Sequence, residues 1–208
     1  MADEFRSLID DPLRERYADH VRSWLYLANT PYLDWLFGGE SLANEILSVW
    51  MRREISENSL RNVYLYFRDG EPYGGIVCLT GPDLVRARKA DAVSLMRVVP
   101  QDSRAGVLDR LKACGHLFDY PAPDEFYLAK MGVIQKAQGT GIGKKIFGLS
   151  LEAGAARGFE KFRGDVHVDN VAALKGYQSH GFSVGERREC SFSGLAYVLV
   201  RSLKGRVE

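Results

Sequence analysis

The sequence has few cysteines, no long hydrophobic run and no excess of either charge. Its three cysteines, Cys78, Cys114 and Cys190, are odd in number and widely spaced, so they form neither a zinc motif nor a disulfide framework. We therefore expect no metal site and a reduced, cytoplasmic setting in which these cysteines serve as small buried apolar residues. The 28 Lys and Arg residues against 27 Asp and Glu residues give a net charge of +1, so no overall field would attract nucleic acid.

The sequence also lacks the signals of a membrane protein. A membrane-spanning helix needs about 18 consecutive apolar residues, and no such run occurs. The start, Met1 to Phe5, lacks the basic and apolar segments of a signal peptide. A length of 208 residues, with 46% hydrophobic and 26% charged residues, predicts one globular domain over residues 1–208 with neither nucleic acid nor a membrane as partner.

Proline, glycine and helix-capping residues divide the front of the sequence into short elements. Asp11-Pro12, Thr30-Pro31 and Ser41 predict the starts of helices over residues 12–28, 32–37 and 41–53. Asp69-Gly70 predicts a hairpin between strands at 63–67 and 73–79. Residues 92–99 fit either a strand or a short helix.

The rest of the sequence alternates between helices and strands. Further helices are predicted at 103–117, 142–157 and 170–180, and further strands at 126–134, 161–168, 182–186 and 195–200. The order of these elements along the chain predicts an α+β fold with a mixed sheet, because helices come first, then a hairpin, and then alternating strands and helices. A helical crossover joins the strands at 126–134 and 161–168, so these two should run parallel.

The most informative feature is the turn from Gln138 to Lys145, between a predicted strand and a predicted helix. Glycines at 139, 141 and 143 allow a tight turn that points several backbone N–H groups at one spot. The start of a helix adds partial positive charge there. Lysines at 144 and 145 would oppose that dipole unless an anion offset them. The turn therefore predicts a site for phosphate or pyrophosphate, with a glycine-rich turn that binds nothing as the alternative.

Two common nucleotide motifs are excluded by specific residues. A Walker A loop would need glycine at position 138 and a hydroxyl residue at 145, where Gln138 and Lys145 stand. A dinucleotide fingerprint would need a third glycine at position 144, which is Lys144, and normally follows the first strand of a domain. The phosphate-bearing ligand is therefore of another kind.

A second group of residues follows one strand later. Asn170, Ala173 and Tyr177 fall on a predicted helix that Gly181-Phe182 follows, with Asn170 and Tyr177 about two turns apart on one face. A tyrosine hydroxyl near an anion-binding turn could act as a general acid. An N-capped helix with a core tyrosine is the alternative.

Together the two segments resemble the GCN5-related N-acetyltransferase (GNAT) family. Gln138, Gly141 and Gly143 match its signature Q/R-x-x-G-x-G/A, and residues 170–182 match its later segment. The resemblance covers about residues 126–186, and less specifically the hairpin. It implies a mixed, mostly antiparallel central sheet flanked by helices, with two splayed parallel central strands. It also implies a helical acceptor-side region over residues 1–60 and a core sheet with the coenzyme A site over residues 61–208.

The resemblance further implies acetyl-CoA as cosubstrate, with no metal. The acceptor amine would attack the thioester directly through a tetrahedral intermediate, and Tyr177 would protonate the leaving thiolate. Backbone groups of the strand would hold the pantetheine arm and polarise the thioester carbonyl, the turn would hold the pyrophosphate, and Asn170 would contact the cofactor. The implied cofactor-binding residues are Met131, Gly132, Val133, Gln138, Gly139, Thr140, Gly141, Ile142, Gly143, Lys144 and Asn170.

The attacking amine also needs a base. Some family members carry a glutamate five residues before the motif asparagine, and Asp165 occupies that position, with His167 on the same strand face. A surface charge paired with Arg163 is the alternative for Asp165. Asp124 and Glu125, at the entry of the central strand, are other candidates.

The acceptor is expected to be a primary amine of a small molecule. This rests on aromatic, apolar segments near the presumed acceptor side and on the lack of an acidic cluster for a basic peptide. A protein N-terminal or lysine acetyltransferase, an enzyme for a longer acyl-CoA, and a non-catalytic CoA sensor are the alternatives. A homodimer is a family-level expectation.

Overall fold

Seven strands form one sheet in the computed structural model, which describes residues 3–190 and 195–202. They are β1 (Asp3–Ser7), β2 (Val63–Arg68), β3 (Glu71–Thr80), β4 (Glu125–Val133), β5 (Lys161–His167), β6 (Phe182–Glu189) and β7 (Ala196–Ser202). Their order across the sheet is β1-β2-β3-β4-β5-β7-β6. Only the central pair, β4 and β5, is parallel. The α+β class and the mixed, mostly antiparallel sheet are therefore confirmed.

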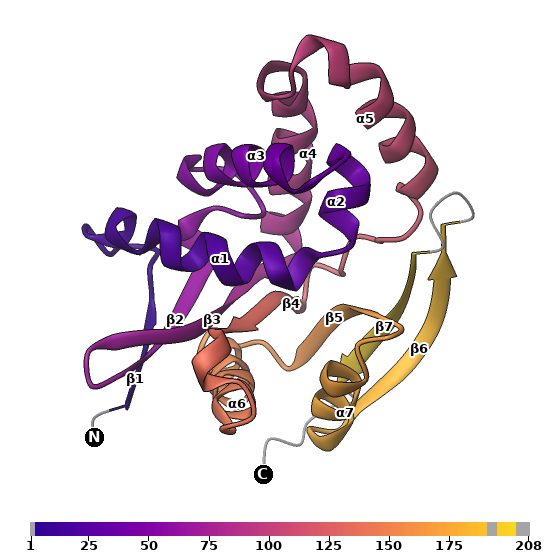
Figure 1. Ribbon diagram of the computed structural model, residues 1–208. Helices are drawn as coiled ribbons and strands as arrows, with labels where there is room; N and C mark the ends of the chain where they lie inside the picture. Colours follow the sequence, from indigo (N-terminus) through magenta and orange to yellow (C-terminus); the bar gives the residue numbers. More distant parts are fainter. Residues whose placement is uncertain (1–2, 191–194, 203–208) are drawn as a thin grey trace.

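Helices cover both faces of this sheet (Figure 1). They are α1 (Ala18–Asn29), α2 (Tyr32–Phe37), α3 (Glu40–Arg52), α4 (Gly81–Val98), α5 (Gln101–Cys114), α6 (Ile142–Ala156) and α7 (Val171–Ser179). Figure 1 shows α1 to α5 gathered on one side of the sheet and α6 and α7 on the other. None of the described helices combines the length and hydrophobicity that crossing a membrane requires.

Alternation along the strands divides the core into two layers. Leu65, Val77 and Tyr127 point to the side of α1 to α4, whereas Phe126 and Leu128 point to the side of α6. Successive strand residues face opposite sides of a sheet, so both faces of the central strands are apolar. The sheet is therefore buried between the two helical layers. The three cysteines are buried, as expected.

The front of the chain differs from the prediction in two places. Residues 1–60 were expected to be helical, but β1 forms the edge of the sheet, where Phe5 stacks on Tyr64 of β2 with ring centroids 5.5 Å apart. This strand is only five residues long, and its pairing with β2 identifies it. The helix expected from residue 12 begins as a 3-10 turn, Arg14–Tyr17, before α1.

Residues 92–99, which fitted a strand or a helix, mostly belong to the long helix α4. This helix begins at Gly81, where the hydroxyl of Thr80 accepts the N–H of Asp83 at 3.2 Å and Pro82 occupies the first turn. Proline in the first turn of a helix loses no intrahelical hydrogen bond. The sequence Thr-Gly-Pro-Asp is thus a helix start that the sequence analysis missed. Helices α4 and α5 together separate β3 from β4 along the chain.

Candidate active site

The turn between β4 and α6 holds two glycines in the left-handed region of backbone conformation. Gly139 has a φ of +76°, and Gly141, which precedes α6, has a φ of +84°. No heavy atom lies within 4 Å of a Cβ built at either position. Glycine is therefore favoured here by the backbone conformation and not by crowding.

The start of α6 is open to a ligand. Its N-terminal residue Gly141 offers no side-chain cap, so the first N–H groups of the helix, at Ile142, Gly143 and Lys144, have no acceptor within the helix. The dipole of α6 adds partial positive charge at the same place. An anion at this point would accept those N–H groups, as the sequence predicts.

The polar side chains of the turn hold its shape. Thr140 donates its hydroxyl to the carbonyl of Ala137 at 2.6 Å, and Gln138 donates its amide to the carbonyl of Val133 at 3.3 Å. Both side chains are therefore engaged with the main chain. Any contact that Gln138 and Thr140 make with a ligand would come mainly from their backbone.

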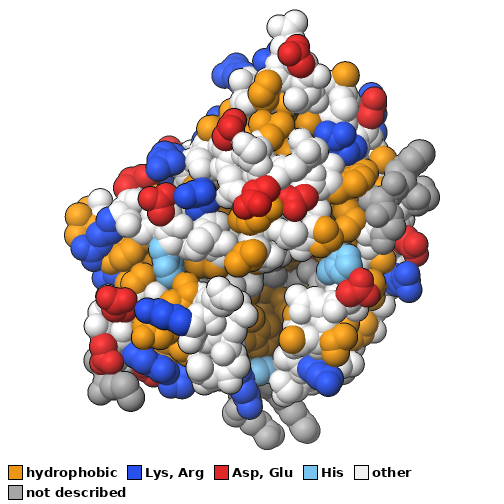
Figure 2. Space-filling view, in the orientation of Figure 1, with side chains coloured by type: hydrophobic (Ala, Val, Ile, Leu, Met, Phe, Trp, Pro, Cys, Tyr) orange, Lys and Arg blue, Asp and Glu red, His pale blue; other side chains and the backbone are white. Residues whose placement is uncertain are grey.

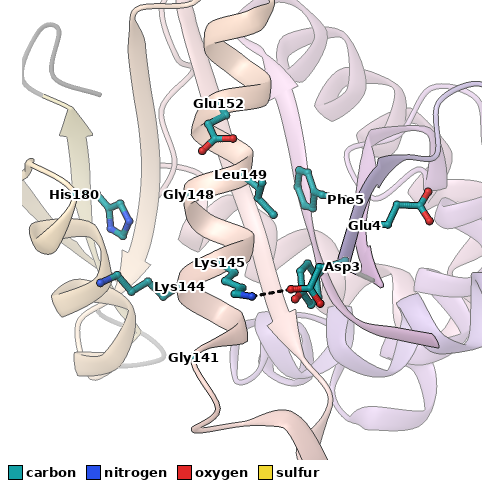
Figure 3. Close-up of a pocket in the computed structure, with 11 residues that line it drawn as sticks. Asp3, Glu4, Phe5, Gly141, Lys144, Lys145, Gly148, Leu149, Glu152 and His180 are labelled. Atoms are coloured by element: carbon teal, nitrogen blue, oxygen red, sulfur yellow. Dashed lines mark hydrogen bonds and ion pairs between the residues drawn. The ribbon is translucent and has the colours of Figure 1, made fainter. Parts of the chain in front are cut away.

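Lys144 and Lys145 leave opposite sides of α6 (Figure 3). The ammonium of Lys145 donates to Asp3 Oδ2 at 2.7 Å and so ties β1 to α6. Lys144 extends to the side of α6 that faces His180, and in the described part of the chain it makes no ion pair. Both lysines line a pocket of about 530 Å³ along the outer face of α6. Lys144 is therefore the available cation beside the turn.

The parallel strands separate after a short paired stretch. Pairing runs only from Glu125 opposite Lys161 to Tyr127 opposite Arg163, whereas β4 continues along β3 as far as Val133. In the described sheet, the edge of β4 over residues 128–133 that faces β5 therefore carries unpaired backbone groups. Figure 2 shows the surface hollowed between α6 and α7, with hydrophobic side chains at the bottom. The splay of the central strands is thus confirmed.

A bulge in β4 lies at the start of this open edge. Val77 of β3 is opposite Lys130, and the next residue, Cys78, is opposite Leu128, so Ala129 has no partner of its own. A classic bulge bends its strand and leaves one residue outside the regular ladder. The bulge therefore lets backbone groups near Ala129 point into the gap.

Tyr177 reaches from α7 to the point where the strands separate. Its hydroxyl lies 3.5 Å from the carbonyl oxygen of Leu128 in β4, and a Cβ built on Gly164 of β5 would be 2.5 Å from that hydroxyl. The ring packs edge-on against Phe147, with centroids 4.8 Å apart. Burial raises the pKa of Tyr177 above its usual range, so the phenol keeps its proton at neutral pH. The protonated phenol therefore lies beside the gap, and its role as general acid stays a prediction.

Asn170 caps α7 as the sequence predicts. Its side-chain oxygen accepts the N–H of Ala173 at 3.0 Å. The cap fixes the start of the helix that carries Tyr177. A contact between Asn170 and a cofactor stays a prediction.

Asp165 lies on the face opposite Tyr177 and is enclosed. Its side chain is only 3% exposed, and Oδ2 accepts the hydroxyl of Tyr127 at 2.7 Å. Burial raises the pKa of Asp165, against the opposing effects of the Tyr127 hydrogen bond and of the Arg163, Arg88 and Arg188 charges. The carboxyl is therefore a stronger base than an exposed aspartate and is almost fully enclosed. Its role as base stays a prediction.

The sequence analysis missed a charged cluster beside Asp165. Glu57 forms ion pairs with Lys130 of β4 and, at 2.9 Å, with Arg88 of α4. Burial acts to raise the pKa of Glu57, but the charges of Arg88 and Lys130 outweigh it and lower the pKa to about 2. Arg88 also lies 3.4 Å from the hydroxyl of Tyr127. Finding this cluster from sequence would have required placing α4 against β4.

The other candidate bases differ in exposure. The side chain of Glu125 is 7% exposed and pairs with Arg201 at 3.1 Å, and Asp124 pairs with Lys161. His167 is more open, with 21% of its side chain exposed, and its Nδ1 lies 3.3 Å from the backbone nitrogen of Asp169. Asp124 is the most accessible of these groups, with 59% of its side chain exposed, but it is held by Lys161. Over residues 3–190 and 195–202, no group of three His, Cys, Asp or Glu side chains is placed to hold a metal ion.

One family model matches most of the chain. Residues 21–182 match the model of the family described as "Acetyltransferase (GNAT) family". No match was found among curated protein sequences.

Solved structures show the same fold at low sequence identity. A crystal structure of an acetyltransferase superposes with a TM-score of 0.67 at 21% identity, covering 97% of this chain and 100% of that one. An N-acetyltransferase from Staphylococcus aureus Mu50 gives 0.66 at 16% identity, covering 95% and 99%. The ribosomal-protein-S18-alanine N-acetyltransferase from Escherichia coli gives 0.54 at 13% identity, covering 100% and 99%.

Proposed function

Because the chain belongs to the GNAT acetyltransferase family, we propose that it transfers the acetyl group of acetyl-CoA to a primary amine of a small molecule. The observation that carries this proposal is the placement of Tyr177. Its protonated hydroxyl lies where β4 and β5 separate, 3.5 Å from the carbonyl of Leu128. A proton donor at the end of an open strand edge suits the departure of a thiolate.

The open turn supports acetyl-CoA as the acetyl donor. The N–H groups of Gly139 to Lys144 would hold the pyrophosphate, with Lys144 beside them. The backbone of Met131, Gly132 and Val133 would pair with the amide groups of the pantetheine arm, since this edge of β4 has no strand partner in the described sheet. The uncapped α6 and the left-handed glycines 139 and 141 fit these contacts.

The reaction needs no nucleophile from the enzyme. The amine nitrogen forms a bond to the acetyl carbon, the carbon–sulfur bond breaks, and Tyr177 gives its proton to the departing sulfur. A backbone N–H at the Ala129 bulge would stabilise the negative charge that develops on the acetyl oxygen. The amine proton passes to a base. Asp165 is the candidate base, and its Oδ2 already accepts the hydroxyl of Tyr127 at 2.7 Å.

The preference for a small acceptor rests on the face of the sheet opposite α7. Helices α1 to α5 cover that face and leave aromatic side chains around the gap. The carboxylates near the gap, Glu57 and Asp165, are already paired. A lysine-rich peptide would find few free acidic partners there. A protein acceptor is the competing candidate.

Calorimetry and thiol release together test the proposal. Titration with acetyl-CoA should show saturable binding, and thiol release should depend on added amine. Binding of acetyl-CoA without amine-dependent thiol release would indicate that the protein is a CoA sensor and not a transferase. A Kd of about 1 mM corresponds to a binding free energy of only about −4 kcal/mol. The absence of binding at about millimolar acetyl-CoA would therefore overturn the cofactor assignment.

A further inference from the structure

Four aromatic rings form a connected wall on the acceptor face of the sheet. Tyr32 of α2 meets Phe118 edge-on, with ring centroids 5.3 Å apart, and Phe118 meets Tyr197 of β7 at 4.9 Å. Tyr197 in turn meets the ring of His167 of β5 at 5.2 Å, nearly perpendicular to it. We call these four residues the aromatic wall. All four residues are half-buried, and three of them, Tyr32, Phe118 and Tyr197, also pack against a small buried cluster that includes Leu117.

The aromatic wall lies next to the gap between β4 and β5. His167 follows Asp165 by two residues on the same strand face, and it is paired with Tyr197 across the sheet. Arg88 connects Phe118 to β4, because its guanidinium lies 5.7 Å from the Phe118 ring and 5.5 Å from the Tyr127 ring. A molecule that presents an amine to the gap from this face would therefore rest on the wall.

Tyr32 and Tyr197 supply the two phenols of the wall. In the part of the chain that the structure describes, neither Tyr32 nor Tyr197 makes a hydrogen bond through its hydroxyl. Burial raises the pKa of both above their usual range, so both phenols stay neutral. The wall therefore offers ring surface and two uncharged hydroxyls, which suits a largely apolar group with some polar edges.

Three arginines hold the segment that carries Phe118. Arg88 donates to the carbonyl of Asp119 at 3.2 Å, and Arg163 donates to the carbonyl of Tyr120 at 3.1 Å. Arg188 donates to the carboxylate of Asp119 at 2.6 Å. These bonds come from α4, β5 and β6, so the position of Phe118 is fixed from three elements. A wall held in this way loses little conformational entropy when a ligand binds.

The charges around the wall disfavour a second ammonium group. Glu57 is neutralised by Arg88 and Lys130, and Asp119 is paired with Arg188. Asp169, 3.8 Å from His167, is 88% exposed to solvent and so strongly screened. An acceptor with several positive charges would meet guanidinium groups here, and the carboxylate of Asp169, which has no arginine or lysine partner among the described residues, is strongly solvated.

From the wall and these charges we infer that the acceptor is a monoamine on an aromatic or comparably flat apolar group, packed against Tyr32, Phe118, His167 and Tyr197. The inference rests on the proposed function and narrows it to a substrate class. Aromatic pairs contribute beyond the area they bury, and the amine would be left at the gap beside the acetyl group. Polyamines, amino sugars and lysine-rich peptides should be poor acceptors.

A panel of amines tests the proposed class of acceptor. Thiol release would be measured with 2-phenylethylamine, tyramine, putrescine, glucosamine and a short peptide with a free N-terminus, all at saturating acetyl-CoA. We expect kcat/KM for the two aromatic amines to exceed that for putrescine and glucosamine by about tenfold or more, as a hydrophobic pocket discriminates by about 10- to 200-fold. Equal or higher kcat/KM for putrescine, glucosamine or the peptide would overturn the inference and leave the acetyltransferase assignment intact.

Variants of the aromatic wall test whether its rings bind the acceptor. Tyr197→Leu and Phe118→Leu should each raise KM for 2-phenylethylamine about three- to tenfold, the range expected for one aromatic pair. The KM for putrescine should stay unchanged, and the matched control Tyr197→Phe should keep the aromatic preference. Because Phe118 lies outside the strands and helices, its variant remains informative if Tyr197→Leu folds poorly.

Failure of this inference and failure of the proposed function give different experimental results. Equal losses for aromatic and aliphatic amines in both leucine variants would show that the wall is structural and would overturn the inference. If acetyl-CoA binds but no amine in the panel or in a wider set releases thiol, the proposed function itself fails. Calorimetry with acetyl-CoA on the same variants should give an unchanged Kd, which confirms that only the acceptor side has been altered.

Discussion

A Cβ placed on Gly132 would lie 2.8 Å from the Cβ of Trp24, because α1 crosses β4 at that residue. The indole continues toward β3, where a Cβ on Gly75 would be 3.0 Å from its Cζ2 atom. Trp24 is 1% exposed and anchors α1 in the core. Two glycines on neighbouring strands thus accept one tryptophan, and this contact sets how closely the acceptor-side helices approach the open edge of β4.

Substitution of Gly132 should therefore destabilise the protein. Gly132→Ala forces the Trp24 side chain or α1 to move, and overpacking of this kind costs about 1 to 3 kcal/mol. The measurement is the free energy of unfolding in urea. The matched control is Gly176→Ala in α7, where no heavy atom lies within 4 Å of the added Cβ and the gain in helix propensity is up to about 1 kcal/mol. Equal stability of the two variants would contradict the packing argument.

Removal of the Tyr177 hydroxyl should reduce turnover and leave cofactor binding nearly intact. Tyr177→Phe should lower kcat by about 100-fold or more, the usual contribution of a general acid. The Kd for acetyl-CoA should stay within about twofold, because the lost interaction is made mainly in the transition state. An unchanged kcat would remove Tyr177 from the mechanism. Since burial raises the pKa of this phenol, wild-type turnover should show no loss from Tyr177 ionisation up to about pH 10.

The two lysines after the glycine turn should behave differently. Lys144→Gln should weaken acetyl-CoA binding about tenfold, since a hydrogen bond to a charged group contributes about 1.5 to 3 kcal/mol. The loss should shrink as salt is raised. Lys145→Gln is the control, because its ammonium is bound to Asp3 Oδ2 at 2.7 Å. Calorimetry at two salt concentrations measures both variants, and a larger loss in Lys145→Gln would reverse the assignment.

The buried carboxyl of Asp91 should make stability depend on pH. Burial raises its pKa to about 6, although it accepts the N–H of Glu57 at 2.8 Å and the hydroxyl of Ser56 at 3.1 Å. The folded state therefore binds more protons than the unfolded state between about pH 4 and 6. The stability that this raised pKa contributes is fully present below about pH 4 and is lost as pH rises through 6. A shift of about two units corresponds to roughly 3 kcal/mol.

Asp91→Asn isolates this effect. The amide keeps an oxygen for the N–H of Glu57 and has no charge to desolvate, so the variant should be the more stable protein at pH 8. Urea unfolding of both proteins from pH 4 to 8 measures the difference. The low pKa of Glu57, about 2, acts in a separate and more acidic range. A parallel pH dependence in the two proteins would show that Asp91 titrates normally.

Local residue chemistry accounts for the parts of the site that the sequence predicted. The glycine turn, the Asn170 cap and the parallel pair β4 and β5 each depend on residues close together in the chain. The hairpin at Asp69-Gly70 is of the same kind, with φ of +51° and +81° at the two turn residues. Local signals were not sufficient everywhere, because the start of α4 at Gly81 was missed and the helix expected from residue 12 begins as the 3-10 turn Arg14–Tyr17.

The parts that the sequence did not predict depend on distant partners. The edge strand β1 is identified by its pairing with β2, across more than fifty residues of chain. The enclosure of Asp165 depends on Tyr127 and on arginines from α4 and β6. Lys145 is held by Asp3, which lies more than a hundred residues away in the chain, whereas Lys144 makes no ion pair with any described residue. Burial and ion pairing of this kind arise only from the tertiary fold.

The insertion of α4 and α5 between β3 and β4 also affects how the sheet is assembled. These strands are neighbours in the sheet, yet residues 81–124 separate them in the chain. Closing a flexible loop costs about 0.6 kcal/mol more for each doubling of its length, and non-local pairing slows folding. During synthesis the edge of β3 that pairs with β4 stays unpaired until residues 81–124 and then β4 have been made. The helices that carry Arg88 to the acceptor face therefore also delay the moment at which the acetyl site can form.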